Sequence, residues 1–379
     1  MPGKELTPEN CLLRAGEGLD REGAALNRRL GIILALIACC TSSFLPNGMA
    51  AETAPKFLGA QSCANSLCHG GADDKRNQFN TWLNKDFHTR AHATLNLNRS
   101  ARIAETLKIN DAATDARCTV CHNPFQTVAP DRKGERVGKL EGVSCETCHN
   151  AAENWLLTHT RTDLRYEQKV AAGMRDLKNL YVRANTCVAC HQNLEPDLRA
   201  AGHPELTFEL DGQCATMPRH WTETNRLRGA QAWVVGQAAA LREAAAQSSA
   251  TKPSAEAEQR TQALAWLLGV SPDAKAADAL AQRTAGESWS GADVRARLES
   301  FTSTREQFAN PKVPPAELAQ RAERLVLAID RLLVALGIDK KSPASVELDQ
   351  LFKDVQSRAD FDAKGFAEHL AEFEAAVAR

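Results

Sequence analysis

The chain has 379 residues, of which 43% are hydrophobic and 25% are charged. A chain of this length can form two or more domains, and its apolar content excludes a largely disordered protein. The 46 Lys and Arg residues are balanced by 47 Asp and Glu, which gives a formal net charge of -1. This balance offers no basis for binding a polyanion, so no nucleic-acid partner is expected.

The N-terminal stretch has the pattern of an export signal. Two arginines precede a short apolar run at 30–38, far below the roughly 20 residues that a membrane-spanning helix needs. Small residues near position 51 suit an ordinary signal peptidase, so we expect a signal peptide over residues 1–51. The alternative is a lipoprotein cleavage box ending at Cys39, which would anchor the chain to a membrane. Both interpretations predict a periplasmic or otherwise exported protein.

Cysteine is the most informative residue type. Among 12 cysteines, eight form four close pairs that are each followed directly by histidine. Three pairs are Cys-x-x-Cys-His units, and the first is a variant with four residues between its thiols. Two such thiols each add to a vinyl group of one haem, and the adjacent imidazole ligates the iron. The predicted attachment cysteines are Cys63, Cys68, Cys118, Cys121, Cys145, Cys148, Cys187 and Cys190, and the predicted proximal ligands are His69, His122, His149 and His191.

The alternative is a tetrahedral zinc site built from two of these pairs, such as Cys118 and Cys121 with Cys145 and Cys148. In that interpretation the histidines are incidental. With 10 His in 379 residues, four such successions arise by chance roughly once in two million. The pattern therefore favours four covalently attached haem c groups. The variant first pair has a disulfide or a zinc pair as its own alternative.

The region around these motifs is expected to fold on its cofactors. Aromatic residues make up only 5% of the chain, and porphyrin rings would supply the flat apolar mass that such side chains usually provide. Strand signals are weak, so residues 52–225 are predicted to form a haem domain of short helices and loops. The short linker between His122 and Cys145 favours neighbouring positions for the second and third haems.

The character of the sequence changes after residue 225. Residues 226–379 contain no cysteine and one histidine, His369, in Ala-, Leu-, Glu- and Arg-rich sequence that favours helix. Apolar residues recur at three- and four-residue intervals from Leu318 to Leu336, which predicts a helix capped by Gly337. Further helices are predicted at 229–247, 255–268 and 361–377, with breaks at Pro253, Pro272 and Pro343. The expected fold class is all-α, with a C-terminal helical bundle following the haem domain.

Each haem iron has a second axial position, and histidine is the main candidate to fill it. Beyond the leader the only methionines are Met174 and Met217. The histidines outside the motifs are His88, His92, His159, His203, His220 and His369. Bis-histidine ligation is therefore expected, with lower reduction potentials than methionine ligation gives.

Several stretches carry a family resemblance. They are Trp82 with Asp86, Phe87 and His88; Gly142 to His149 with Trp155, Leu156 and His159; Ala201, Gly202, His203 and Pro204 with Leu206, Phe208 and Glu209; and Pro218, Arg219, His220 and Trp221. Together they make the region from Phe57 to Trp221 resemble the family of cytochrome c-554, the tetrahaem electron acceptor of hydroxylamine oxidoreductase. The resemblance implies distal ligands at His88, His159 and His203. His92 stands where the family has an aromatic residue, so His88 and His92 remain alternatives, and His220 is the further candidate.

Three distal ligands for four irons would leave one haem five-coordinate, as the resemblance also implies. The expected function is electron transfer between redox partner proteins, without catalysis of its own. The alternative is a multihaem oxidoreductase that acts on a small nitrogen or sulfur compound at the open iron. No Cys-x-x-Cys-Lys motif is present, which argues against similarity to pentahaem nitrite reductases.

Two further features carry predictions. The helices from Leu227 to Arg379 are expected to cover the haem core, and docking of a partner protein is the alternative. Cys214, which belongs to no motif, is expected to be a buried thiol. A homo-oligomer is compatible with the sequence.

Overall fold

The computed structural model describes residues 54–221, 223, 225–250, 252–310 and 312–378. Within these ranges the chain is built from α-helices and short 3₁₀ turns, and pairing between extended segments is limited to one bridge between Phe57 and Lys133. The predicted all-α class is confirmed. The predicted signal peptide over residues 1–51, including Cys39, lies outside the described residues.

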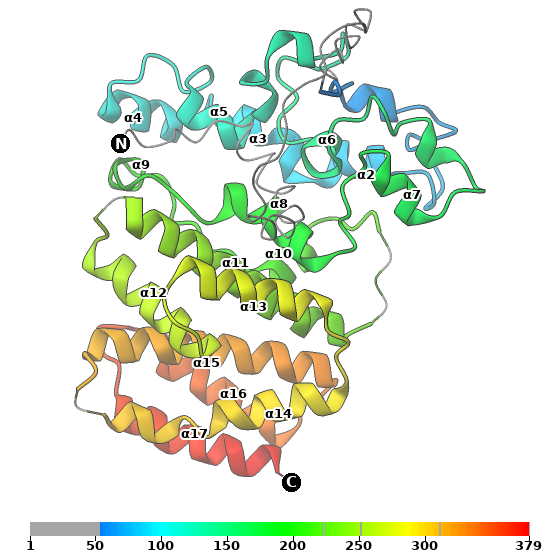
Figure 1. Ribbon diagram of the computed structural model, residues 1–379. Helices are drawn as coiled ribbons and strands as arrows, with labels where there is room; N and C mark the ends of the chain where they lie inside the picture. Colours follow the sequence, from blue (N-terminus) through cyan, green and yellow to red (C-terminus); the bar gives the residue numbers. More distant parts are fainter. Residues whose placement is uncertain (1–53, 222, 224, 251, 311, 379) are drawn as a thin grey trace, which may run out of the picture.

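The first half of the structure consists of short helices joined by long loops (Figure 1). Its α-helices are α2 (Gln78–Lys85), α3 (Ala91–Thr94), α4 (Asn98–Leu107), α5 (Ala116–His122), α6 (Cys145–His149), α7 (Tyr166–Ala171), α8 (Leu180–His191), α9 (Pro196–Ala200) and α10 (Leu210–Thr216). The 3₁₀ turns are η1 (Ala60–Cys63), η2 (Phe87–Arg90), η3 (Pro124–Gln126), η4 (Pro130–Arg132) and η5 (Thr158–Thr160). All of the haem-type motifs fall in this half, which we call the motif half.

The second half is a stack of longer helices beneath the motif half in Figure 1. These helices are α11 (Leu227–Ala250), α12 (Ala255–Leu268), α13 (Ala274–Gly286), α14 (Gly291–Thr302), α15 (Pro315–Leu336), α16 (Pro343–Asp354) and α17 (Ala363–Val377), with the 3₁₀ turn η6 (Arg305–Ala309) after α14. The predicted C-terminal helical bundle is therefore present. We call α11 to α17 the C-terminal helices.

The helix α15 shows how the apolar spacing produces this packing. Its residues Leu325, Ile329 and Leu332 follow one another at three- and four-residue intervals and are all fully buried. Gly337 ends the helix in the left-handed conformation, with φ of 72°, which costs glycine little because it lacks a Cβ. The pattern from Leu318 to Leu336 thus predicted both the helix and its end.

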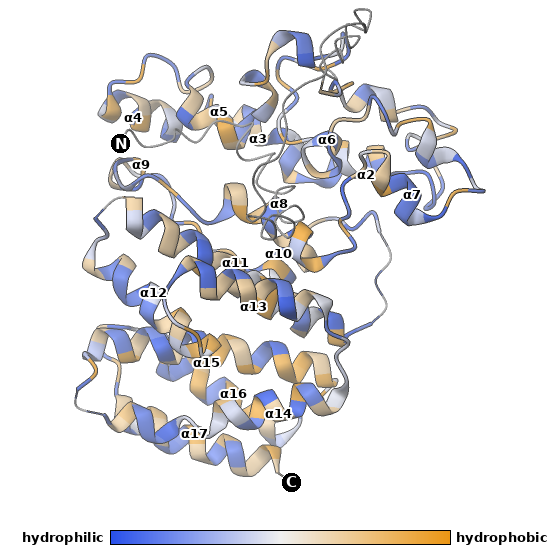
Figure 2. Cartoon of the chain, in the orientation of Figure 1, coloured by the Kyte–Doolittle hydropathy of each residue, from blue (hydrophilic) through white to orange (hydrophobic). Residues whose placement is uncertain are grey.

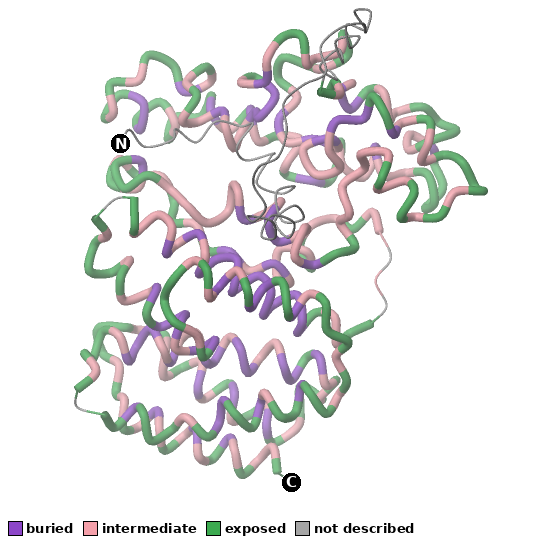
Figure 3. Tube along the Cα trace, in the orientation of Figure 1, coloured by how far each residue is buried: buried purple, intermediate pink, exposed green. Residues whose placement is uncertain are grey.

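One apolar core fills the C-terminal helices and extends into the motif half. Figure 3 shows the buried residues concentrated along α11, where Trp233, Val234 and Val235 are at most 1% exposed. Leu180 on α8 and Leu210 on α10 are fully buried in the same core. The apolar core is therefore continuous across residue 225, where the sequence changes character.

The motif half is packed differently. Outside the large core it has two small clusters of buried apolar residues, one around Phe57 and Phe125 and another around Leu95 and Ala104, and other buried side chains such as Phe79 belong to neither. Figure 2 shows apolar residues scattered through its loops. The strongly exposed large apolar side chains of this half are Leu67, Leu83, Phe87, Leu97, Leu140 and Leu157. Such exposure is typical of a surface that another group covers.

Candidate haem sites

Three of the four motifs lie at the ends of α-helices. The second motif closes α5, the third forms α6 and the fourth closes α8. Residues three and four apart share one helix face, so both thiols and the imidazole of each motif face the same way. The helix starts are fixed locally, since Asp115 caps α5, Asn179 caps α8, and Ser144 begins a capping box at α6.

The wider first motif is folded into a tight loop. The carbonyl of Asn65 accepts hydrogen bonds from the backbone N–H groups of Cys68 and Gly70, at 2.8 and 3.0 Å. The N–H of His69 donates to the carbonyl of Cys63 at 3.3 Å. The two additional residues are thereby absorbed in a bulge. A Cβ at Gly70 would lie 1.9 Å from the carbonyl oxygen of Ala64, so this turn requires glycine.

A buried glutamate connects the first and third motifs. Glu146 lies inside the third motif, is 1% exposed, and accepts hydrogen bonds from the N–H groups of Gly59 at 2.6 Å and Ala152 at 2.7 Å. Gly59 immediately precedes the turn that carries Cys63. The carboxylate is suited to this place because it only accepts hydrogen bonds, and the backbone N–H groups of Leu58, Gly59 and Ala152 all donate to it.

Each motif histidine faces one histidine from outside the motifs. The ring centroids are 6.0 Å apart for His69 and His159, 6.4 Å for His122 and His203, 6.3 Å for His149 and His220, and 6.0 Å for His191 and His88. The rings of the first pair are nearly parallel, at 17°, whereas those of His191 and His88 are perpendicular, at 90°. Each of these eight histidines is thus in ring contact with one other member of the set.

These separations fit the space that a ligated metal ion requires. With metal–nitrogen bonds of about 2.0 Å, and a ring centre about 1.1 Å behind each nitrogen, two axial imidazoles have centroids about 6.2 Å apart. The residues present therefore fit an iron held between the two members of each pair.

Three of the four motif histidines have a polar contact at Nδ1. His69 Nδ1 lies 2.9 Å from Gln78 Oε1, and His122 Nδ1 lies 3.0 Å from the carbonyl oxygen of Ala91. His191 Nδ1 faces the side-chain amide of Gln213 at 3.3 Å. The amide oxygen of Gln213 is buried without a partner, and a flip of the amide would give this Nδ1–H its acceptor. Such contacts leave Nε2 of each ring free to bind a metal.

The distal rings are held in the same manner. His88 Nδ1 lies 3.0 Å from Asp86 Oδ1, and His203 Nδ1 lies 2.8 Å from the carbonyl oxygen of Pro204. His159 Nδ1 lies 3.3 Å from the carbonyl oxygen of Trp155. A ligating histidine typically donates its second N–H to such an acceptor, which fixes the ring and raises its basicity.

Burial keeps several of these imidazoles neutral. Burial lowers the pKa of His149 to about 4 and that of His191 to about 4. It also lowers the pKa of His122, His159 and His220. Neutral imidazole is the form that donates its lone pair to a metal.

Two other side chains beside the pairs fit a bound haem. Trp155 packs edge-on against His159 at 5.2 Å, and Trp221 packs against His220 at 5.3 Å. The indole Nε1 of each tryptophan is buried without a hydrogen-bond partner. A haem propionate is an acceptor that would suit such a donor. Two indole N–H donors beside the histidine pairs therefore have no acceptor within the protein.

Exposed apolar residues stand beside the same histidines. Leu67 is 79% exposed, Phe87 is 79% exposed and Leu157 is 80% exposed. Each lies one or two residues before a paired histidine. Large apolar side chains at such positions fit contact with a porphyrin face.

The remaining candidate ligands lie elsewhere. His92 is buried on α3 and interacts electrostatically with His122, whereas the ring that faces His191 is that of His88. His369 Nδ1 lies 2.7 Å from Asp354 Oδ2 among the C-terminal helices. Cys214 is half-buried on α10, and burial raises the pKa of its thiol.

Sequence reasoning missed the residues that orient the rings. Gln78, Thr94 and Gln213 each touch Nδ1 of a proximal histidine. They are polar residues on helices, and nothing in their spacing distinguishes them from solvated positions. Asp86 could have been found, since it stands two residues before His88, where a carboxylate both caps the turn and meets Nδ1.

The described residues contain no group of three or more His, Cys, Asp or Glu side chains placed to hold one metal ion. The thiols instead meet across motifs. The thiol of Cys63 interacts with that of Cys145, and the thiol of Cys121 interacts with that of Cys190. None of the described helices combines the length and apolar character that a membrane crossing requires.

The chain was compared with known proteins. Residues 62–150 match the family model described as cytochrome c554 and c-prime. This segment holds the first three motifs and His88. Comparisons with curated proteins and with solved structures gave no match. The family resemblance is thus confirmed over this segment, and with it covalently bound haem and electron transfer. Over residues 62–150 the chain is therefore similar to the family described as cytochrome c554 and c-prime.

Proposed function

We propose that the chain is an exported tetrahaem c-type cytochrome that carries electrons between redox partner proteins. The haems are attached at the four cysteine pairs from Cys63 to Cys190, and each iron is ligated by two histidines. Haem supplies one-electron redox chemistry when it is bound. The protein's own residues hold the rings, keep both axial positions filled and exclude other ligands.

The observation that carries this proposal is the pairing of the histidines. Each motif histidine has one non-motif partner at 6.0 to 6.4 Å. His220 is the partner that the family resemblance did not supply, and it faces His149. The four pairs join separate loops and helices. Packing alone does not explain them, because histidine is less often fully buried than an apolar residue.

The thiol contacts support a continuous row of haems. Cys63 of the first motif meets Cys145 of the third, and Cys121 of the second meets Cys190 of the fourth. Cys187 of the fourth motif also interacts electrostatically with Cys148 of the third. The neighbours in space therefore run first, third, fourth, second. These thiol interactions do not test the proximity of the second and third haems, which the short linker between His122 and Cys145 favours and which stays a prediction.

The alternative function requires an iron with an open axial position. A multihaem oxidoreductase would bind its small nitrogen or sulfur substrate there. In the structure His69, His122, His149 and His191 each face a second imidazole. No observation favours the catalytic function, and electron transfer needs no open site.

The proposed location follows from the leader. Haem c attachment takes place outside the cytoplasm, in agreement with a signal peptide over residues 1–51. Redox partner proteins would dock near the exposed edges of the motif half. Membrane association would follow only from lipidation at Cys39.

The proposal is tested on the protein exported with its haem. Mass spectrometry of tryptic peptides should find haem on each of the four cysteine pairs, and stepwise reduction should show four one-electron transitions. Zinc in place of haem, or an unmodified pair among them after correct export, would contradict it. Loss of haem from a Cys68→Ala variant at the first motif alone would show that the widened motif is an attachment site.

A further inference from the structure

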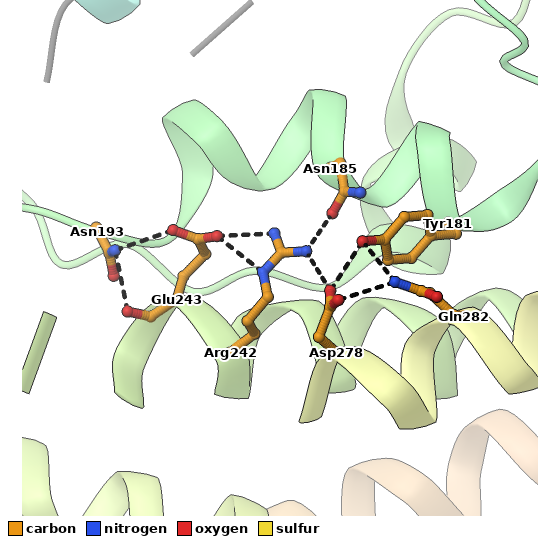
Figure 4. A network of polar contacts seen from close by, with 7 residues as sticks. All are labelled: Tyr181, Asn185, Asn193, Arg242, Glu243, Asp278 and Gln282. Carbon is orange, nitrogen blue, oxygen red and sulfur yellow. Dashed lines mark hydrogen bonds and ion pairs between the residues drawn. The ribbon is translucent and has the colours of Figure 1, made fainter. Parts of the chain in front are cut away.

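A polar network joins the helix of the fourth motif to the C-terminal helices (Figure 4). Arg242 on α11 is at its centre. Its guanidinium donates to Asn185 Oδ1 on α8 at 2.7 Å and to Asp278 Oδ1 on α13 at 2.8 Å. It also donates twice to Glu243 Oε1, at 3.0 and 2.7 Å. Because the N–H donors of a guanidinium lie in one rigid plane, the side chains that accept from them are held in defined positions around it.

The network holds α8 at two points and the chain just beyond its end at a third. Tyr181 donates its hydroxyl to Asp278 at 2.9 Å, and Asn185 accepts from Arg242. Asn193, two residues beyond His191, donates to the carbonyl oxygen of Glu243 at 3.2 Å. The chain is thus held both before Cys187 and after His191.

The charge at the centre is stable. The side chain of Arg242 is 17% exposed. Burial acts to lower the pKa of Arg242, but the carboxylates of Glu243 and Asp278 outweigh burial and raise it. A largely buried cluster of paired charges resists displacement, because removing the guanidinium would leave two carboxylates without their cation.

The position of α8 decides the orientation of one imidazole. His191 ends α8, and its ring stands perpendicular to that of His88, at 90°. The other three pairs have angles of 17°, 64° and 69°. A rotation of α8 about its axis would turn the ring of His191 relative to that of His88, which is held separately by Asp86.

We propose that Arg242 is a positioning residue of the fourth haem site, and that through it the C-terminal helices set the angle between the two axial imidazoles. This inference rests on the proposed tetrahaem function. It assigns the C-terminal helices a role as the support of the fourth haem, and it does not require them to bind a partner.

The angle between axial imidazoles has a spectroscopic signature. Parallel rings split the iron d orbitals strongly, whereas perpendicular rings leave two of them nearly degenerate. The ferric low-spin centre of His88 and His191 is therefore expected to give the electron paramagnetic resonance signal with the largest g value of the four. General destabilisation of the fold does not shift this signal selectively.

The test compares Arg242→Gln and Asn185→Ala with the control Arg297→Gln in the exported holoprotein. Arg297 is a half-buried arginine of the C-terminal helices whose guanidinium lies over Trp289 at 5.4 Å. In Arg242→Gln and Asn185→Ala we expect the largest-g signal to shift, together with the reduction potential of that centre, while the other signals stay in place. The control should leave all signals unchanged.

An unchanged largest-g signal in a variant that retains all its haem would overturn the inference. If Arg242→Gln does not accumulate, Asn185→Ala decides, because it keeps the charged cluster intact. A wild-type protein without haem on Cys187 and Cys190 would instead refute the proposed function. The two failures are therefore distinguishable.

Discussion

At the scale of single residues, the candidate sites combine distinctive sequence motifs with polar contacts at histidine Nδ1, most of which have no sequence signature of their own. The four motif histidines directly follow the cysteine pairs, so the sequence alone proposes them as proximal ligands. The distal partners depend on the tertiary fold, and the sequence could not join His220 with His149 or choose His88 over His92. The structure makes these pairings through loops and short turns.

Removing the proposed fourth distal ligand should open one iron. His220→Ala leaves His149 without the imidazole that faces it at 6.3 Å, so one ferric centre should change from low spin to high spin and bind cyanide. Electron paramagnetic resonance and optical titration with cyanide measure both effects. His92→Ala is the control and should leave every centre low spin. A high-spin centre in the control, with none in His220→Ala, would reverse the assignment.

The buried carboxyl of Asp211 predicts a pH dependence of stability. Burial raises the pKa of Asp211 to about 6, although Arg331 Nε lies 2.7 Å away. The folded state then binds this proton more tightly than the unfolded state, so the stabilisation is complete below the unfolded pKa and is lost as the pH rises through the folded pKa.

We expect the free energy of unfolding of the wild type, relative to Asp211→Asn, to fall by up to about 3 kcal/mol as the pH rises from about 3.9 to above about 6. Urea denaturation of both proteins across this range measures the difference. Asp330→Asn, which also removes a carboxylate beside Arg331, serves as control. A difference that does not vary with pH would show that the folded pKa is not raised.

At the scale of elements, the strongest helical patterns gave the best predictions. The helix at 255–268 has its predicted bounds, and α15 follows the predicted apolar spacing to Gly337. The predictions at 229–247 and 361–377 differ from α11 and α17 by two or three residues at their ends. The exact ends of these helices depend on caps and packing, and apolar periodicity gives no information about either.

Three helices were missed for physical reasons. Helices α13 and α14 are alanine-rich or short, with few large apolar residues to mark a face. Pro343 was predicted to be a break, but it is the first residue of α16, where Ser342 provides the cap. Proline suits this position because the first helical N–H has no partner inside the helix.

The contact between α10 and α11 predicts the effect of one glycine. A Cβ at Gly236 would lie 2.7 Å from Leu210 Cβ, whereas one at Gly229 on the same helix would meet nothing within 4 Å. Overpacking costs about 1–3 kcal/mol, and the helix propensity gained on changing Gly to Ala is about 1 kcal/mol. Gly236→Ala should therefore lower the free energy of unfolding, and Gly229→Ala should raise it or leave it unchanged. Chemical denaturation would contradict this packing if both variants behaved alike.

At the scale of the whole molecule, the two halves share one core. Leu180, Phe208 and Leu210 from the motif half are buried against the C-terminal helices. The sequence indicated a boundary at residue 225 because cysteine and histidine are concentrated before it. The distribution of cysteine and histidine indicates the proposed region of haem attachment. It does not indicate where the apolar core ends.

A chain that ends at residue 225 should therefore be unstable. Each of these three side chains contributes about 1.5–3 kcal/mol when it is fully buried, and their sum is comparable with the about 5–15 kcal/mol that stabilises a typical domain. Limited proteolysis should degrade the haem-loaded fragment 52–225 faster than the same region of the full chain. Equal resistance would support two independent domains.

The central claim is that four covalently bound haems are each held between two histidines. The most direct measurement is electron paramagnetic resonance of the oxidised, exported protein, with the haem content of the same sample determined independently. We expect four haems per chain, all ferric low spin, with no change on addition of cyanide or nitric oxide. A high-spin centre that binds either ligand, or fewer than four haems per chain, would contradict it.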